Sequence, residues 1–290
     1  DPLSSIYYPP MWLTWILPLP LGINLVVLLH VVLGGIGVFI MLRSMGLSFY
    51  ASIVGLLMFA WMPKIYGHIG AGHITMIMAI CLLPWMIAAV NFMNQRKISA
   101  NLPGVVLGLI FLADPRVYPY GCALLGVISI IAHRYNFFLR ILNYFKQVLL
   151  SIMIAAPLLI PMARYVSLST RPELSIDEMA IFSLPFDRLL GLIYPDFGGN
   201  PELSVHFGIF GLIAFLGCIF IRPFSKLKII WCIVFIFSVA YALGDNFLVF
   251  RTLTYIPGFS LLRVPSRALF LAGLAVSVIS AMAADDIVGG

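Results

Sequence analysis

Charged residues are scarce in this sequence: Lys, Arg, Asp and Glu make up 10% of its 290 residues, whereas hydrophobic residues make up 62%. The mean hydropathy is +1.08. A water-soluble domain of this length cannot bury so much apolar surface, so the composition excludes a soluble globular protein and indicates a polytopic membrane protein. The basic residues are scattered between apolar segments and form no continuous stripe, so we expect no nucleic-acid partner.

Cysteine is also rare, and catalytic motifs of soluble enzymes are absent from the sequence. Cys81, Cys122, Cys218 and Cys232 lie inside apolar runs without C-x-x-C spacing, so we interpret them as small buried apolar residues. The chain contains no P-loop, dinucleotide fingerprint, G-x-S-x-G or H-E-x-x-H motif. This pattern excludes nucleotide chemistry of the soluble type. We expect no cofactor, and a divalent metal is not indicated.

Long apolar runs predict an all-α fold, a polytopic transmembrane helical bundle, because a spanning helix needs roughly 20 apolar residues. We place spans at 21–42, 47–62, 74–92, 147–163, 203–221, 229–243 and 266–284. Two shorter segments, 103–113 and 117–132, are separated by Ala113-Asp114-Pro115-Arg116 and fit a bent or re-entrant pair. Residues 10–20 contain Trp12 and Trp15, which favour the headgroup level, and are expected to be interfacial.

Basic residues in short loops indicate which ends of the spans face the cytoplasm. Basic residues cluster at Arg96-Lys97 and between Arg222 and Lys228, so we predict that these loops face the cytoplasm. The opposite side holds most of the carboxylates and a long loop, 164–202. In this loop, Leu174 to Leu192 has the apolar spacing of short interfacial helices. We therefore treat 1–290 as one transmembrane domain whose extracytoplasmic side carries the chemistry.

The last span begins with two arginines four residues apart, in Arg263-Val264-Pro265-Ser266-Arg267. A charge costs about 3 kcal/mol at the centre of a spanning helix, so arginines concentrate at helix ends. Pro265 favours a first helical turn, Ser266 can cap free amides, and the helix dipole is positive at this end. With the two guanidinium groups, these features predict a phosphate-binding site at the membrane surface. Arginines that only anchor the helix to lipid headgroups are an equally good interpretation.

Two histidines flank a glycine-rich stretch before the third span. His68 and His73 are five positions apart, which does not place them on one helical face, and no Cys or acidic residue beside them completes a zinc site. The glycines between them predict a turn. Either His73 lines an outward cavity and hydrogen-bonds a sugar or phosphate, or it caps the following helix.

Polar residues also interrupt the two short apolar segments and the long loop. Asp114 and Arg116 are expected to form an ion pair lining a cavity, the alternative being a pair that only holds the bend. Tyr194 to Gly199 combines aromatic rings and Asp196 with a glycine turn, which suits carbohydrate binding. Other charges of this loop, such as Asp177 and Glu178, are interpreted as a solvated surface.

The order of these motifs resembles the YfhO family of bacterial membrane proteins, which belongs to the GT-C class of lipid-linked-sugar glycosyltransferases. The similarity covers nearly the whole chain. The matching segments are Asp1-Pro2 with Tyr8-Pro9, Leu29-His30 with Gly34-Gly35-Ile36-Gly37 and Leu42-Arg43-Ser44-Met45-Gly46-Leu47-Ser48, Gly72-His73 with Leu83-Pro84-Trp85, Leu168-Ser169-Thr170-Arg171 with Leu174-Ser175, Tyr194-Pro195-Asp196-Phe197-Gly198-Gly199, and Pro257-Gly258-Phe259 with Arg263-Val264-Pro265-Ser266-Arg267. The chain departs from the family at Ala113-Asp114-Pro115-Arg116, where G-H-P-Q is common.

The resemblance implies a GT-C-like enzyme of the bacterial plasma membrane. Such an enzyme moves a sugar from a polyprenyl-phosphate donor to an acceptor in the cell envelope, on the extracytoplasmic side and among membrane lipids. Arg263 and Arg267 are then expected to stabilise the departing phosphate, assisted by Arg171 or Arg251. Further substrate-binding candidates are His73, Asp114, Arg116 and Asp196.

The resemblance also implies that the catalytic carboxylate lies in a first outer loop upstream of Asp1. Because the chain opens on Asp1-Pro2 and closes on Gly289-Gly290, we expect it to be a fragment of a longer protein. A non-catalytic lipid-linked-sugar transporter or flippase and an envelope-assembly scaffold remain as alternatives. The middles of the spans are nearly free of charge, which favours chemistry at one face over transport across the membrane.

Overall fold

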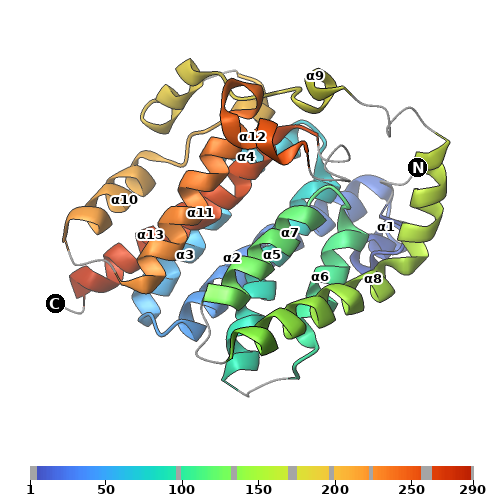
Figure 1. The fold of residues 1–290 in the computed structure, drawn as a ribbon, viewed down its shortest axis with the longest axis horizontal. Helices are drawn as coiled ribbons and strands as arrows, with labels where there is room; N and C mark the ends of the chain where they lie inside the picture. Colours follow the sequence, from blue (N-terminus) through green and yellow to red (C-terminus); the bar gives the residue numbers. More distant parts are fainter. Residues whose placement is uncertain are drawn as a thin grey trace. The chain divides into compact units, whose positions relative to one another are not determined.

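The computed structural model describes residues 5–95, 99–131, 136–168, 175–195, 199–221, 225–255 and 263–288, and within these ranges the chain is helical without strands (Figure 1). The helices long and apolar enough to cross a membrane are Leu19–Ser44, Phe49–Gly70, Ile74–Asn94, Phe137–Ser167 and Pro265–Ile287. They confirm the all-α class and support the assignment to a membrane. Contacts divide the chain into two compact units, Asp1–Leu56 with His73–Ala163, and Leu57–Gly72 with Arg164–Gly290.

The first unit is built around α5 (Ile74–Asn94), which packs against α2 (Leu19–Ser44) and α6 (Leu102–Ala113). Its other elements are η1 (Pro9–Trp12), α1 (Leu13–Ile16), α7 (Tyr118–Ile131), and most of α3 (Phe49–Ala60) and of α8 (Phe137–Ser167). The contact between α2 and α5 requires a residue without a side chain at Gly37, because a Cβ atom there would lie 2.6 Å from Nε1 of Trp85. The same Nε1 donates a hydrogen bond to the carbonyl oxygen of Leu33 at 2.9 Å, which fixes the indole on α2.

The second unit is built around α13 (Leu269–Val288), which packs against α10 (Ile209–Ile221) and α11 (Lys226–Ala242) (Figure 1). The short helix η7 (Pro265–Ala268) leads into α13, and both are buried almost throughout. The remaining elements of the second unit are α4 (Pro63–Gly70), α9 (Ile176–Met179), η3 (Phe186–Leu192), η4 (Pro201–Leu203), η5 (Gly244–Asn246) and α12 (Leu248–Leu253). This unit contains the arginines of the last predicted span.

Hydropathy located most helices but misplaced several of their ends. The predicted span 203–221 begins too early, because residues 201–208 form η4 and a non-helical segment before α10 starts at Ile209. The predicted span 147–163 is too short, because α8 starts at Phe137 and its first turns carry Arg140 and Lys146, which lower the local hydropathy. The predicted break at Asp114 is confirmed: α6 ends at Ala113 and α7 begins at Tyr118.

Candidate functional site

The core of the candidate site is formed by two polar residues on α4. Pro63 occupies the first position of this helix, where its missing amide hydrogen costs nothing. Lys64 and His68 are four residues apart and therefore share one helical face, and both are fully buried. The sequence had predicted a turn for the region from Gly67 to His73. That prediction is correct only at its end, where Gly72 has a φ of +77°, because Gly67 to Gly70 belong to α4.

Lys64 fixes the backbone of η4. Its Nζ donates hydrogen bonds to the carbonyl oxygens of Pro201 at 3.1 Å, Glu202 at 2.8 Å and Ser204 at 3.3 Å. Three acceptors need three hydrogens, so this geometry fits the charged ammonium group. The Nζ also lies 5.4 Å from the ring centroid of Phe270, in cation–π range. A single buried lysine thus holds the segment that carries Glu202.

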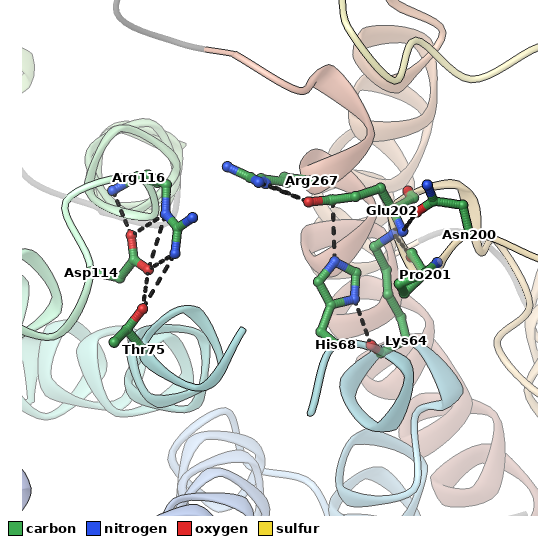
Figure 2. Close-up of polar contacts among 9 residues, drawn as sticks. All are labelled: Lys64, His68, Thr75, Asp114, Arg116, Asn200, Pro201, Glu202 and Arg267. Carbon is green, nitrogen blue, oxygen red and sulfur yellow. Dashed lines mark hydrogen bonds and ion pairs between the residues drawn. The ribbon is translucent and has the colours of Figure 1, made fainter. Parts of the chain in front are cut away.

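Glu202 links His68 on α4 to Arg267 on η7, as Figure 2 shows. Its Oε1 accepts hydrogen bonds from Nε of Arg267 at 3.1 Å and from Nη2 at 2.8 Å, and its Oε2 lies 3.2 Å from Nε2 of His68. Burial by itself would raise the pKa of this carboxyl. The hydrogen bonds from His68 and Arg267, together with the charge of Arg267, outweigh burial and lower the pKa of Glu202 to about 2.

The contacts of His68 define where its protons lie. Its Nδ1 is 2.9 Å from the carbonyl oxygen of Lys64, which only accepts hydrogen bonds, so Nδ1 carries a hydrogen. The contact between Nε2 and Oε2 of Glu202 then holds one further proton between the ring and the carboxyl group. Lys64, His68 and Arg267 thus gather three basic groups around Glu202. His68 and Glu202 are metal-binding residue types, but both ring nitrogens of His68 already contact protein acceptors.

The two arginines of the last span have different environments. Arg267 is 12% exposed and is held by Glu202, whereas Nε of Arg263 is shielded from solvent and has no hydrogen-bond partner.

The prediction that Ser266 caps the helix is wrong. The N-cap residue is Val264, with a φ of +62°, and Oγ of the fully buried Ser266 makes no hydrogen bond. A branched residue in this left-handed conformation is strained, and such strain is concentrated at functional sites.

A cavity of about 430 Å³ is lined in part by the segment that Lys64 holds. Leu203 and Val205 contribute to its wall, η3 contributes Asp187 and Arg188, and the residues after η3 contribute Tyr194. The ring of Tyr194 is 72% exposed and is therefore accessible to a ligand. The predicted carbohydrate motif thus lies in part on a cavity wall, although Asp196 is outside the described residues.

Asp114 and Arg116 form the predicted ion pair in the first unit (Figure 2). Nε of Arg116 donates to Oδ1 of Asp114 at 2.9 Å, and Nη2 donates to Oδ2 at 2.5 Å. Thr75, on the first turn of α5, donates its hydroxyl hydrogen to Oδ2 at 2.8 Å. Asp114 is fully buried and Arg116 is mostly buried. Through Thr75, the pair joins the break between α6 and α7 to α5.

The other predicted substrate-binding residues are Arg251, His73 and Arg171. Arg251 is 59% exposed and donates from Nε to Oδ1 of Asp245 at 2.6 Å, which lowers the pKa of Asp245 and raises that of Arg251. His73 is the N-cap residue of α5 in the first unit and makes no side-chain capping hydrogen bond. Asp1 and Arg171 lie outside the described residues.

Sequence reasoning missed Lys64, Glu202 and Thr75. The spacing of Lys64 and His68 could have indicated a shared polar face on a helix. Glu202 gave no local signal, because an isolated carboxylate in a loop is normally solvated.

Comparisons with known proteins give no match: no family model, no curated protein and no solved structure matches the chain. The function is therefore argued from the residues and their geometry.

Proposed function

We propose that the chain is the membrane domain of a GT-C-type glycosyltransferase related to the YfhO family. In this proposal a sugar moves from a polyprenyl-phosphate donor to an acceptor on the extracytoplasmic side of a bacterial plasma membrane. The observation that carries the proposal is the segment of residues 201–205, in which Glu202 belongs to the buried charge cluster and Leu203 and Val205 line the open cavity. One short segment therefore contributes both to a site suited to phosphate and to a site suited to sugar.

The charge cluster supports phosphate binding through the basic groups that it gathers around Glu202. Arg267 uses Nε and Nη2 on Glu202, and its third guanidinium nitrogen, Nη1, is the group that we assign to the phosphate. An arginine that is already oriented can stabilise charge developing on a leaving phosphate without reorganisation. Arg263, four positions earlier, is the second proposed phosphate ligand, and its shielded Nε has no hydrogen-bond partner.

The cavity supports sugar binding through the kinds of groups that line it. Tyr194 offers an accessible aromatic face for the C–H groups of a pyranose ring, while Asp187 and Arg188 offer hydrogen-bond partners for hydroxyl groups. At about 430 Å³ the cavity falls within the roughly 300–1,000 Å³ range of small-molecule sites.

The catalytic base is assigned to neither buried carboxylate. A general base must have a lone pair available to the acceptor hydroxyl. Glu202 accepts hydrogen bonds from Arg267 and has a lowered pKa, and Asp114 is enclosed by Arg116 and Thr75. We therefore propose that these carboxylates position arginines and that another carboxylate removes the proton.

The test is sugar transfer by the full-length protein in membranes, using radiolabelled polyprenyl-phosphate sugars. Arg263→Ala is expected to lower kcat at least tenfold without disturbing the Glu202 pair, and Tyr194→Ala is expected mainly to raise KM. Arg164→Ala is the matched control, because it removes an exposed arginine at the end of α8. Transfer that is unchanged in Arg263→Ala would refute the phosphate role. Donor movement across the bilayer without transfer would favour the flippase alternative.

A further inference from the structure

A second cavity, of about 280 Å³, lies within the first unit. Its wall is formed by the last turns of α5 and α7 and by the start of α6 and α8. α5 and α7 contribute their C-terminal ends, and α6 and α8 contribute their N-terminal ends. All four contributions therefore lie at one end of this unit. This is the end opposite to the break at Asp114, so the cavity is separate from both clusters described above.

The polar part of this cavity comes mainly from one face of α8. Arg140, Asn143 and Gln147 follow one another at spacings of three and four residues, which places them on one side of the helix. Gln147 is already engaged, because its Oε1 accepts from the amide of Gly104 at 2.7 Å and its Nε2 donates to the carbonyl of Ala100. Gln147 therefore fixes the wall, and Arg140 and Asn143 contribute further polar groups to the lining.

The charge of the lining has one sign. Arg140 carries the charge among the described lining residues, which include no carboxylate. The Nε atom of Arg140 is shielded from solvent. The opposite wall is apolar and includes Val90, Met93 and Leu125. A shielded guanidinium beside amides and an apolar wall complements a ligand that joins an anionic oxyacid to a hydrocarbon chain.

The position of the cavity indicates where such a ligand comes from. α5 and α8 are both long and apolar enough to span a membrane, so their ends lie at the level of the lipid headgroups. In the sequence, Arg96 and Lys97 follow α5 and Arg134 precedes α8, and basic residues next to spans attract anionic lipids. A volume of about 280 Å³ accommodates a phosphate head and the first carbons of its chains, but not a whole lipid.

We propose that this cavity binds the phosphate of an anionic phospholipid, with Arg140 contacting the phosphate and Val90 and Leu125 contacting the glycerol and first methylenes. The site is independent of the proposed glycosyltransferase activity, because it shares no residue with the donor or sugar sites. It requires only that the helices span a membrane.

The test uses the purified full-length protein in a neutral detergent. Binding of phosphatidylglycerol, phosphatidylcholine and inorganic phosphate is measured by native mass spectrometry and by the shift of the thermal unfolding midpoint. Phosphatidylglycerol is expected to bind and to raise the midpoint more than phosphatidylcholine. Arg140→Gln is expected to weaken phosphatidylglycerol binding tenfold or more, in line with the roughly 1.5–3 kcal/mol of a charge-assisted hydrogen bond.

Two further variants separate the site from general charge effects. Arg164→Gln removes an arginine from the other end of α8 and is expected to leave lipid binding unchanged. Arg140→Lys retains the charge and is expected to keep most of the binding, and it tests the site even if Arg140→Gln does not fold. Equal binding of the two lipids, an equal loss in Arg164→Gln, or a midpoint shift by inorganic phosphate as large as that by lipid would each overturn the proposal.

Discussion

Replacing Glu202 by glutamine removes the negative charge from the buried cluster while keeping the size of the side chain. Arg267, 12% exposed, and the fully buried Lys64 would then lie near a neutral amide. Breaking a buried ion pair by removing one partner costs about 3–5 kcal/mol. A lowering of the pKa of Glu202 from 4.5 to about 2 corresponds to about 3 kcal/mol, at about 1.36 kcal/mol per pKa unit. Both routes lead to an expected loss of about 3 kcal/mol in the free energy of unfolding.

The same reasoning predicts a pH dependence. Because folding lowers the pKa of Glu202, its contribution is fully present above about pH 4.5 and is lost as the pH falls toward about 2. The stability difference between wild type and Glu202→Gln should therefore be constant near neutral pH and shrink across this acidic window.

The assay is equilibrium unfolding in mixed micelles, followed by tryptophan fluorescence at several pH values. Asp177→Asn is the matched control, because it neutralises an exposed carboxylate on α9 and should change stability by less than about 0.5 kcal/mol. A loss below about 1 kcal/mol in Glu202→Gln, or a difference that does not shrink on acidification, would refute the ion-pair account.

Two further predictions concern the backbone of the site and the packing of the first unit. Lys64→Met removes the hydrogen-bond donor shared by the carbonyl oxygens of Pro201, Glu202 and Ser204. Exchange of the amide hydrogens in residues 201–204 should then accelerate at least tenfold, while exchange in α5 stays unchanged. Gly37→Ala places a Cβ atom 2.6 Å from Trp85 and should destabilise the protein by about 1–3 kcal/mol in the same unfolding assay. Gly70→Ala is its control, because a Cβ atom there meets nothing within 4 Å and should be neutral or slightly stabilising. Equal effects of the two glycine variants would contradict the packing argument.

The sequence by itself determined the helical class and the position of most long helices. Hydropathy is a local property, so it located α2, α5 and α13 close to their observed bounds. It also located the break at Asp114 and its ion pair, because both partners are only two residues apart. The resemblance to a glycosyltransferase family and the sidedness of the membrane stay predictions.

Tertiary structure decided which charged residues form the buried cluster. His68 and Glu202 are 134 positions apart, and Arg267 follows Glu202 by 65 positions, so no local periodicity relates them. Lys64 and Glu202 belong to residue types that are normally solvated. Lys64 is buried here because three backbone carbonyl oxygens accept its hydrogen bonds, and the carboxylate of Glu202 is buried because Arg267 and His68 contact it. A charge leaves water only where a complementary group is held in place. Whether that group is present depends on how distant segments pack, which hydropathy and spacing do not encode.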